Sequence, residues 1–389
     1  MLLTIIHYLI LFYLGFSTIY ILVFAVASRF SAKSKPVVCE KDRKFAVLVP
    51  GFKEDNVIVS TVAEALTQNF PSSLFEIVVI ADSFLPQTLI KIAQLPVRVI
   101  EVSFENSTKS KSINKALDVL PDDFDIALIL DADNHMEQDF LRKINNFFSR
   151  GYICVQGHRI AKNMNTSMAI LDAISEEINN NLFRKGHRVL GFSAALIGSG
   201  MAFEYRYYKT VMKNIDAVGG FDKELELAVI KNGYEIAYCE DALIYDEKVT
   251  NIKHFSKQRR RWLSAQWIYF RQSFQTLFSE LFINRNLDYF VKAVQFSFPP
   301  RSVLLMFLLL ATIGSYFFAS QAFTIIWSTL FVMLVTSILL AIPGYLYNKR
   351  SLMALFMLPQ SMLMMLLVLF RLKGANKKFL HTEHGLSGS

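Results

Sequence analysis

The sequence contains few of the residues that build metal centres and disulfide frameworks. Only three cysteines and seven histidines occur among its 389 residues, and neither kind shows the close, regular spacing of metal ligands. Cys39, Cys154 and Cys239 lie far apart, which indicates reduced thiols in a cytosolic domain. We therefore expect His158 to be structural, and neither a ligand nor a base.

Two common nucleotide-binding motifs are also absent. The chain has no Gly-X-Gly-X-X-Gly and no Gly-Lys-Ser/Thr of a P-loop, so NAD and ATP sites of the usual kind are unsupported. The formal net charge is +8, but the basic residues crowd next to apolar segments and form no long stripe. This pattern favours an anionic bilayer surface or a phosphorylated substrate over nucleic acid as partner.

Apolar residues are in excess, and they are concentrated at the two ends of the chain. The hydrophobic fraction is 53% and the mean hydropathy is +0.33, which predicts an integral membrane protein. Residues 1–28 form one apolar run, and about 20 such residues cross a bilayer as a helix. No basic residue precedes this run, as one would in a signal peptide, whereas the linker 29–44 is basic. The positive-inside rule therefore predicts an N-terminus outside the cytoplasmic (inner) membrane and a cytoplasmic linker.

The carboxyl-terminal part predicts further membrane contact. Residues 263–300 mix aromatic residues with glutamines and arginine, as expected of amphipathic helices lying at the cytoplasmic interface. Residues 301–372 then predict two or three membrane helices, of which two are well defined, at 303–319 and 323–345.

The last apolar run, 352–370, creates a conflict with the basic tail 373–389. A single crossing would place the tail outside, against the positive-inside rule. Either the run spans the membrane despite the tail, or it is re-entrant or interfacial and is broken at Pro359. The sequence leaves both arrangements open.

Between the apolar ends, residues 45–262 alternate strand-like runs with helical patterns. This alternation predicts an α/β domain with a mostly parallel sheet and helices on both faces. The clearest strand begins at Ile126 and stops at Asp131 and Asp133, and ligands of such sheets bind beyond the carboxyl ends of the strands. Two carboxylates there suit Mg²⁺ or Mn²⁺, although a solvated turn is an alternative on these residues alone.

Several segments occur in the order and approximate spacing found in family 2 glycosyltransferases. They are VLVPGFKED, VVIADS, KSKSINKAL, LDADN, GSGMAF, VGGFDKELELAVIKNGYEIAY and QRRRW. The chain resembles this family over residues 45–267, and QRRRW resembles the motif of membrane-bound cellulose, hyaluronan and poly-N-acetylglucosamine synthases. The resemblance implies a GT-A fold over 45–262.

The resemblance also implies a reaction and its partners. It implies an inverting, metal-dependent transfer of a sugar from a nucleotide-diphosphate donor, expected to be a UDP-sugar, to a growing polysaccharide at the cytoplasmic face. Single addition to a lipid or lipid-linked glycan is an alternative. A nonenzymatic membrane scaffold that binds a nucleotide sugar is another, because FDKELEL departs from the family pattern.

The donor site can be assigned by resemblance. Asp131 and Asp133 match the family's Asp-X-Asp, which implies that they bind a Mg²⁺ or Mn²⁺ ion bridging the donor diphosphate, with Asp131 also counted among the substrate contacts. The donor-binding strand ends contribute Pro50, Glu54 and Asp82. The basic residue that precedes the family's helix start is Lys109 or Lys111, and the sequence does not distinguish the two.

The reacting groups are assigned in the same way. A general base must remove the proton of an acceptor hydroxyl, and Glu224 falls at the family's base position, with Asp222 and Lys223 replacing the Thr-Glu that precedes it. Arg261 is expected to neutralise the diphosphate and Trp262 to present a flat face to a sugar.

Three further substrate contacts follow from the same motifs. Gln258 opens QRRRW, and Met201 and Phe203 of GSGMAF are expected near the acceptor. For Arg259 and Arg260, attraction to anionic lipid is an equally open interpretation.

Overall fold

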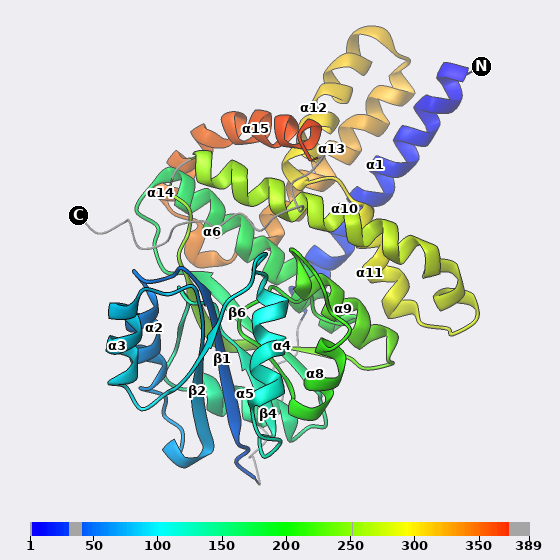
Figure 1. The fold of residues 1–389 in the computed structure, drawn as a ribbon. Helices are drawn as coiled ribbons and strands as arrows, with labels where there is room; N and C mark the ends of the chain where they lie inside the picture. The colour runs from blue at the N-terminus through cyan, green and yellow to red at the C-terminus, as the bar shows by residue number, and fades with distance from the viewer. Residues whose placement is uncertain (1, 31–40, 251, 373–389) are drawn as a thin grey trace.

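The structure is a computed structural model that describes residues 2–30, 41–250 and 252–372 (Figure 1). Most of the predicted basic linker 29–44 and the whole predicted basic tail 373–389 lie outside the described residues.

Eight strands form one sheet in the order β3-β2-β1-β4-β7-β6-β8-β5. The strands are β1 (Phe45–Phe52), β2 (Phe75–Asp82), β3 (Arg98–Val102), β4 (Ile126–Ile129), β5 (His135–Met136), β6 (Cys154–Ala161), β7 (Met201–Glu204) and β8 (Ile236–Asp246). Strands β3, β2, β1 and β4 run parallel, as do β6 and β8, whereas β7 is antiparallel to β4 and β6, and β5 to β8. The predicted α/β sheet is confirmed, with one antiparallel strand inserted at its centre.

Helices cover both faces of the sheet, because successive strand residues point to opposite sides and both sides are apolar. In β1, Ala46 and Leu48 pack in one buried cluster, and Phe45, Val47 and Val49 in the other. The first cluster lies under α4 (Lys109–Val119), α8 (Tyr205–Met212) and α9 (Phe221–Lys231). The second lies under α2 (Ile58–Ala65), α3 (Pro86–Ala93) and α5 (Phe140–Phe148).

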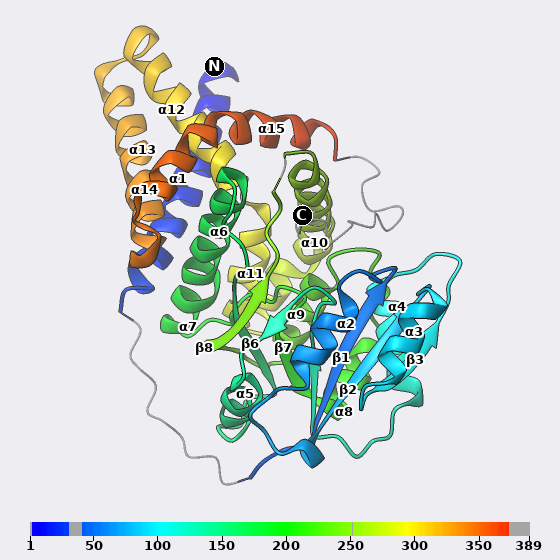
Figure 2. The same ribbon diagram turned by 90° about the vertical axis from the view of Figure 1, so that its left-hand side faces the viewer.

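A third layer of helices lies beyond the carboxyl ends of the parallel strands (Figures 1 and 2). It contains α1 (Leu2–Ala27), α6 (Ser167–Asn179), a π-helical segment Asn180–Gly186, α7 (His187–Val189), α10 (Ile252–Phe282), α11 (Leu287–Ser297), α12 (Arg301–Phe318), α13 (Gln321–Ala341), α14 (Lys349–Ala354) and α15 (Leu358–Phe370). The predicted interfacial region 263–300 thus begins inside α10, and QRRRW lies in the same 31-residue helix.

Among the described residues, four segments are long and apolar enough to cross a membrane: Thr4–Ala27, Arg301–Phe318, Gln321–Ala341 and Lys349–Phe370. Helices α1, α12 and α13 lie side by side in both views, and α15 crosses their common direction. The fourth segment is also interrupted, because a 3₁₀ turn at Leu355–Met357 separates α14 from α15 and Pro359 lies in the first turn of α15. An interruption, which belongs to one of the two arrangements that the sequence left open, is therefore present, but it lies before Pro359.

The π-helical segment is where α1 meets the part of the chain that contains the sheet. A Cβ atom added to Gly186 would lie 2.3 Å from the carbonyl oxygen of Phe24 in α1. Only a residue without a side chain allows the two backbones to approach this closely.

We expect Gly186→Ala to push α1 away and to lower the free energy of unfolding by about 1–3 kcal/mol, as overpacking does. The measurement is thermal unfolding of the full-length protein in detergent. Gly314→Ala in α12 is the control, because a Cβ there meets no atom within 4 Å. Equal effects of both substitutions would contradict the proposed backbone contact.

Candidate functional site

A cavity of about 1190 Å³ begins at the carboxyl ends of β1, β2 and β4 and continues between the helices of the third layer. Asp82 lies at its sheet end and is buried, and its carboxylate accepts hydrogen bonds from Ser83 Oγ at 3.0 Å and Ser112 Oγ at 3.3 Å. Pro50 and Glu54 line the same end. The structure thus brings together the three strand-end residues assigned to the donor.

The turns that follow β1 and β2 are strained. Lys53 has φ 56° and Ser83 has φ 60°, in the left-handed region that residues with side chains rarely adopt. Lys53 N donates to Asp82 O at 3.1 Å, which ties the two turns together. Strain of this kind concentrates where a ligand-binding geometry is held by the surrounding structure.

The structure distinguishes the two lysines that the sequence left open. The Thr108 side chain caps α4 by accepting a hydrogen bond from Lys111 N at 3.2 Å. Lys109, in the first turn, then lines the cavity and forms an ion pair with Asp131, and its Nζ donates to Gly198 O at 2.7 Å. The Lys111 ammonium instead donates to Asn106 O at 3.4 Å, and Lys111 does not line the cavity.

Asp131 and Asp133 line the cavity directly after β4. No group of three or more His, Cys, Asp or Glu side chains that could hold a metal occurs among residues 2–30, 41–250 and 252–372. The protein can therefore offer two carboxylates, a hard oxygen set that fits Mg²⁺ or Mn²⁺ only if a substrate phosphate and water complete the coordination. The residues present fit a metal that arrives with a phosphorylated ligand.

Helix α10 covers the cavity from the opposite side. Gln258, Arg261 and Trp262 all line it, as does Arg259, whose guanidinium lies 4.7 Å from the centroid of the Trp262 ring. Burial lowers the pKa of Arg261, and the nearby carboxylate of Asp131 opposes that effect. A guanidinium this close to the Asp-X-Asp pair can contact the same diphosphate.

Besides Lys111, three residues assigned from the sequence are not brought into the cavity. Met201 and Phe203 are completely buried, because alternate residues of β7 point to one face of the sheet and theirs is the face covered by α4, α8 and α9. Glu224 does not line the cavity either, and its carboxylate accepts a hydrogen bond from Tyr269 Oη at 3.3 Å. Asp222 lines the cavity instead.

Helical geometry explains why Asp222, and not Glu224, lines the cavity. Two positions apart on a helix correspond to a rotation of about 200°, so the two side chains of α9 leave on opposite sides. Burial raises the pKa of Glu224, Asp216 raises it further, and the Tyr269 hydrogen bond lowers it. Asp222 lies 3.2 Å from Lys223 Nζ.

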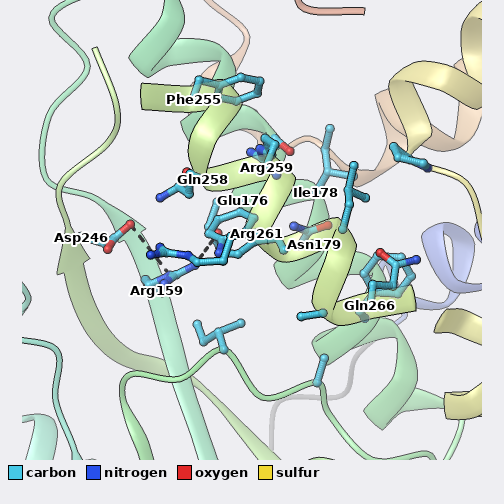
Figure 3. Close-up of a pocket in the computed structure, with 18 of the residues that line it drawn as sticks. Arg159, Glu176, Ile178, Asn179, Asp246, Phe255, Gln258, Arg259, Arg261 and Gln266 are labelled. Atoms are coloured by element: carbon cyan, nitrogen blue, oxygen red, sulfur yellow. Dashed lines mark hydrogen bonds and ion pairs between the residues drawn. The ribbon is translucent and has the colours of Figure 1, made fainter. Parts of the chain in front are cut away.

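A buried ionic cluster in the cavity wall was not found from the sequence. Glu176 accepts hydrogen bonds from Arg159 Nη2 at 2.9 Å and Arg184 Nη1 at 3.4 Å, and Arg159 Nε lies 3.9 Å from Asp246 (Figure 3). Burial raises the pKa of Glu176, but Arg159, Lys248 and Arg184 together hold it well below its usual range. These residues come from β6, α6, the π-helical segment and β8. Because they are far apart in the sequence, no motif indicates the cluster.

Glu176→Gln should lower stability at pH 7 by about 3–5 kcal/mol, because it leaves buried arginines without their carboxylate. The folded pKa of Glu176 is depressed, so its contribution is complete above the unfolded value of about 4.3 and is lost as the pH falls below it. The difference in melting temperature between wild type and variant should therefore shrink between about pH 4 and pH 3. A difference that grows on acidification would contradict this assignment.

The sequence matches the model of a known protein family. The family model described as Glycosyltransferase like family 2 matches residues 42–265, more than half of the chain. No curated protein matches the sequence.

The solved structures that are similar to this chain include the following two. One is the mannosyltransferase PcManGT from Pyrobaculum calidifontis in complex with GDP-Man and Mn²⁺, at 14% identity and a TM-score of 0.57, covering 86% of this chain and 96% of that one. Another is TarS 1-349 of S. aureus in complex with UDP-GlcNAc, at 15% identity and a TM-score of 0.42, covering 78% and 82%. The first of these likenesses shows a shared fold.

Proposed function

Because the chain belongs to glycosyltransferase family 2, we propose that it transfers a sugar from a nucleotide-diphosphate donor to an acceptor at the membrane, with inversion and with a divalent metal. One observation carries the proposal. Lys109, Asp131, Asp133 and Arg261 meet at one end of a single cavity, beyond the strand ends that present Asp82. Cations and metal-binding carboxylates are both needed where a diphosphate leaves.

The residues that line the cavity would have different roles in such a transfer. Asp82 and Glu54 would hold the nucleoside, and Lys109 and Arg261 would neutralise the charge that grows on the departing diphosphate. Asp131 and Asp133 would hold Mg²⁺ or Mn²⁺, which supplies further neutralisation of that charge when bound. The bound GDP-Man and Mn²⁺ of the similar mannosyltransferase support a donor and metal of this class. A UDP-sugar remains our expectation from the resemblance to the synthases.

For a hydroxyl acceptor the base is Asp222 or Glu224. Asp222 lines the cavity, which favours it on position, whereas Glu224 has the raised pKa that makes a carboxylate more basic. A polysaccharide product and single addition to a lipid acceptor are both compatible with this chemistry, and the length of the product separates them.

We further propose that three helices, α1, α12 and α13, span the membrane and that α14 and α15 lie at its cytoplasmic face. The crossing of α15 over the other helices and the break before it support this arrangement. It also removes the conflict with the positive-inside rule, since the basic end of the chain then stays inside.

Removal of a metal ligand tests the catalytic assignment. Asp133→Ala should abolish transfer of labelled sugar, by at least about a hundredfold, since it removes charge stabilisation from the leaving group. The fold should be retained, because Asp133 lines the cavity and belongs to no buried core cluster. Normal turnover with normal dependence on Mg²⁺ or Mn²⁺ in the folded variant would contradict the assignment of Asp133 as a metal ligand. Wild-type membranes that never turn over a nucleotide sugar would instead favour the scaffold alternative.

A paired substitution identifies the base. Asp222→Asn should lower the turnover number by about a hundredfold or more if Asp222 takes the proton, and Glu224→Gln should then have a small effect. The measurement is transfer at saturating donor, with donor affinity as the control for an intact site. The reverse ranking would return the role to Glu224, the residue that the family pattern favours.

Topology is tested by labelling. In a chain carrying Cys39→Ser and Ser389→Cys, a membrane-impermeant thiol reagent should reach the new cysteine only from the cytoplasmic side of sealed vesicles. The remaining cysteines, Cys154 and Cys239, are buried and should stay unlabelled in the folded protein. Labelling from the outside would show that the fourth apolar segment crosses the membrane.

A further inference from the structure

The cavity changes character along its length. Its sheet end is mostly acidic, with the carboxylates of Glu54, Asp82, Asp131, Asp133 and Asp222 in the wall beside Lys109 and Lys223. The charged wall residues that α10, α12 and α14 contribute are basic, and they are Arg259, Arg261, Arg301 and Lys349. The far end is mostly aliphatic and is formed by α12, α13, α14, α15 and the turns beside them, with Leu305, Ile338, Leu339, Leu352, Leu355 and Met365 in the wall and a few polar residues such as Asn348, Ser351 and Ser361.

The basic zone contains two arginines that the protein itself does not fully satisfy. Arg301 opens α12 and donates from Nη2 to Ser175 O at 3.1 Å, while its Nη1 is buried without a hydrogen-bond partner among the described residues. Arg259 pairs with Asp172 at 2.5 Å, and its Nε is likewise buried and unpartnered within the part of the chain that the structure describes. The positive charge of Arg259 acts unfavourably on the Arg301 guanidinium, and the carboxylate of Glu176 offsets part of that effect.

An anion between Arg259 and Arg301 would remove that repulsion and accept the unused donors. Buried polar groups left without partners are costly, and a like-charged pair in a partly apolar wall adds to the cost. Arginine presents a planar fork that matches phosphate, and the N-terminus of α12, where Arg301 lies, favours negative charge.

The aliphatic end decides what the anion is attached to. A glycan placed there would lose the hydrogen bonds of its hydroxyl groups, which is unfavourable without polar partners. A hydrocarbon chain gains free energy from the same surface. Leu352 and Leu355 line the cavity and are also largely exposed, so the far end opens onto the apolar surface of the membrane helices.

We infer that this part of the cavity binds a lipid carrying a phosphate, with the phosphate between Arg259 and Arg301 and the hydrocarbon chain against α12, α13, α14 and α15. The inference deepens the proposed function and rests on it, since the lipid would occupy the part of the same cavity that lies away from the strand ends. It assigns a membrane lipid phosphate as the acceptor class in place of a free polysaccharide chain.

The test uses the full-length protein in vesicles of a neutral phospholipid. Binding is measured with a labelled long-chain polyprenyl phosphate, the matched uncharged polyprenol and a short-chain alkyl phosphate, and transfer with a labelled nucleotide sugar. The long-chain phosphate should bind most tightly, because it alone uses both the arginines and the aliphatic end. Arg301→Gln should weaken its binding by about tenfold or more, the usual effect of losing a hydrogen bond to a charged group. Donor binding should be unchanged.

Two further variants make the result specific. Arg301→Lys keeps the charge and should lose less than Arg301→Gln. Arg271→Gln is the matched control, since Arg271 is exposed on α10 and does not line the cavity. If Arg301→Gln weakens donor and lipid binding equally, the arginine has a structural role and the inference fails.

The remaining outcomes distinguish polyprenyl phosphate from other lipids, and the lipid site from the proposed sugar transfer. Equal binding of polyprenol and polyprenyl phosphate, or equal competition by vesicles containing phosphatidic acid, would overturn the phosphorylated acceptor site. Loss of sugar transfer with every donor, while the polyprenyl phosphate still binds and responds to Arg301→Gln, would overturn the proposed function and leave the lipid site standing.

Discussion

The carboxylate of Glu176 holds the sheet and the membrane-side helices together. It lies in α6 and accepts hydrogen bonds from Arg159 of β6 and from Arg184 of the π-helical segment. Both arginines are buried, so their charges are compensated only where Glu176 and its neighbours meet them. The cluster therefore fixes where α6 sits above the strand ends. The cavity and the α10 side chains that face the strands all depend on that placement.

The position of the helices over the strand ends also explains why the candidate site lies between a polar and an apolar environment. Parallel strands direct their carboxyl ends to one edge, where Asp82, Asp131 and Asp133 follow β2 and β4. The helices that cover this edge belong to the apolar layer packed around α1, α12 and α13. In the proposed reaction, a polar donor would reach the edge from the water side and an apolar acceptor from the membrane side. One continuous cavity joins the two routes.

Charge within the cavity follows this division. The carboxylates at the sheet end suit a metal and a nucleotide, and the arginines contributed by α10 and α12 suit anions. Arg261 lies near the boundary, since the charge of Asp131 acts on it. Residues of opposite charge are thus arranged along the path that would link the proposed donor to the proposed acceptor. A local electric field of this kind stabilises charge that moves from the sugar bond towards the diphosphate.

The sequence by itself determined the α/β class, the strand that ends at Asp131 and the apolar character of both ends, because these depend on local composition and periodicity. The order of its motifs also predicted that Asp82 and Arg261 belong to one site, and both line the cavity. It did not choose between Lys109 and Lys111, or foresee that Asp222 and not Glu224 would face the cavity. Those choices depend on the cap of α4 and the rotation of α9. The cluster around Glu176 and the pair of Arg259 and Arg301 were decided only by the tertiary structure, because each joins residues from separate elements whose charges become important once packing excludes water.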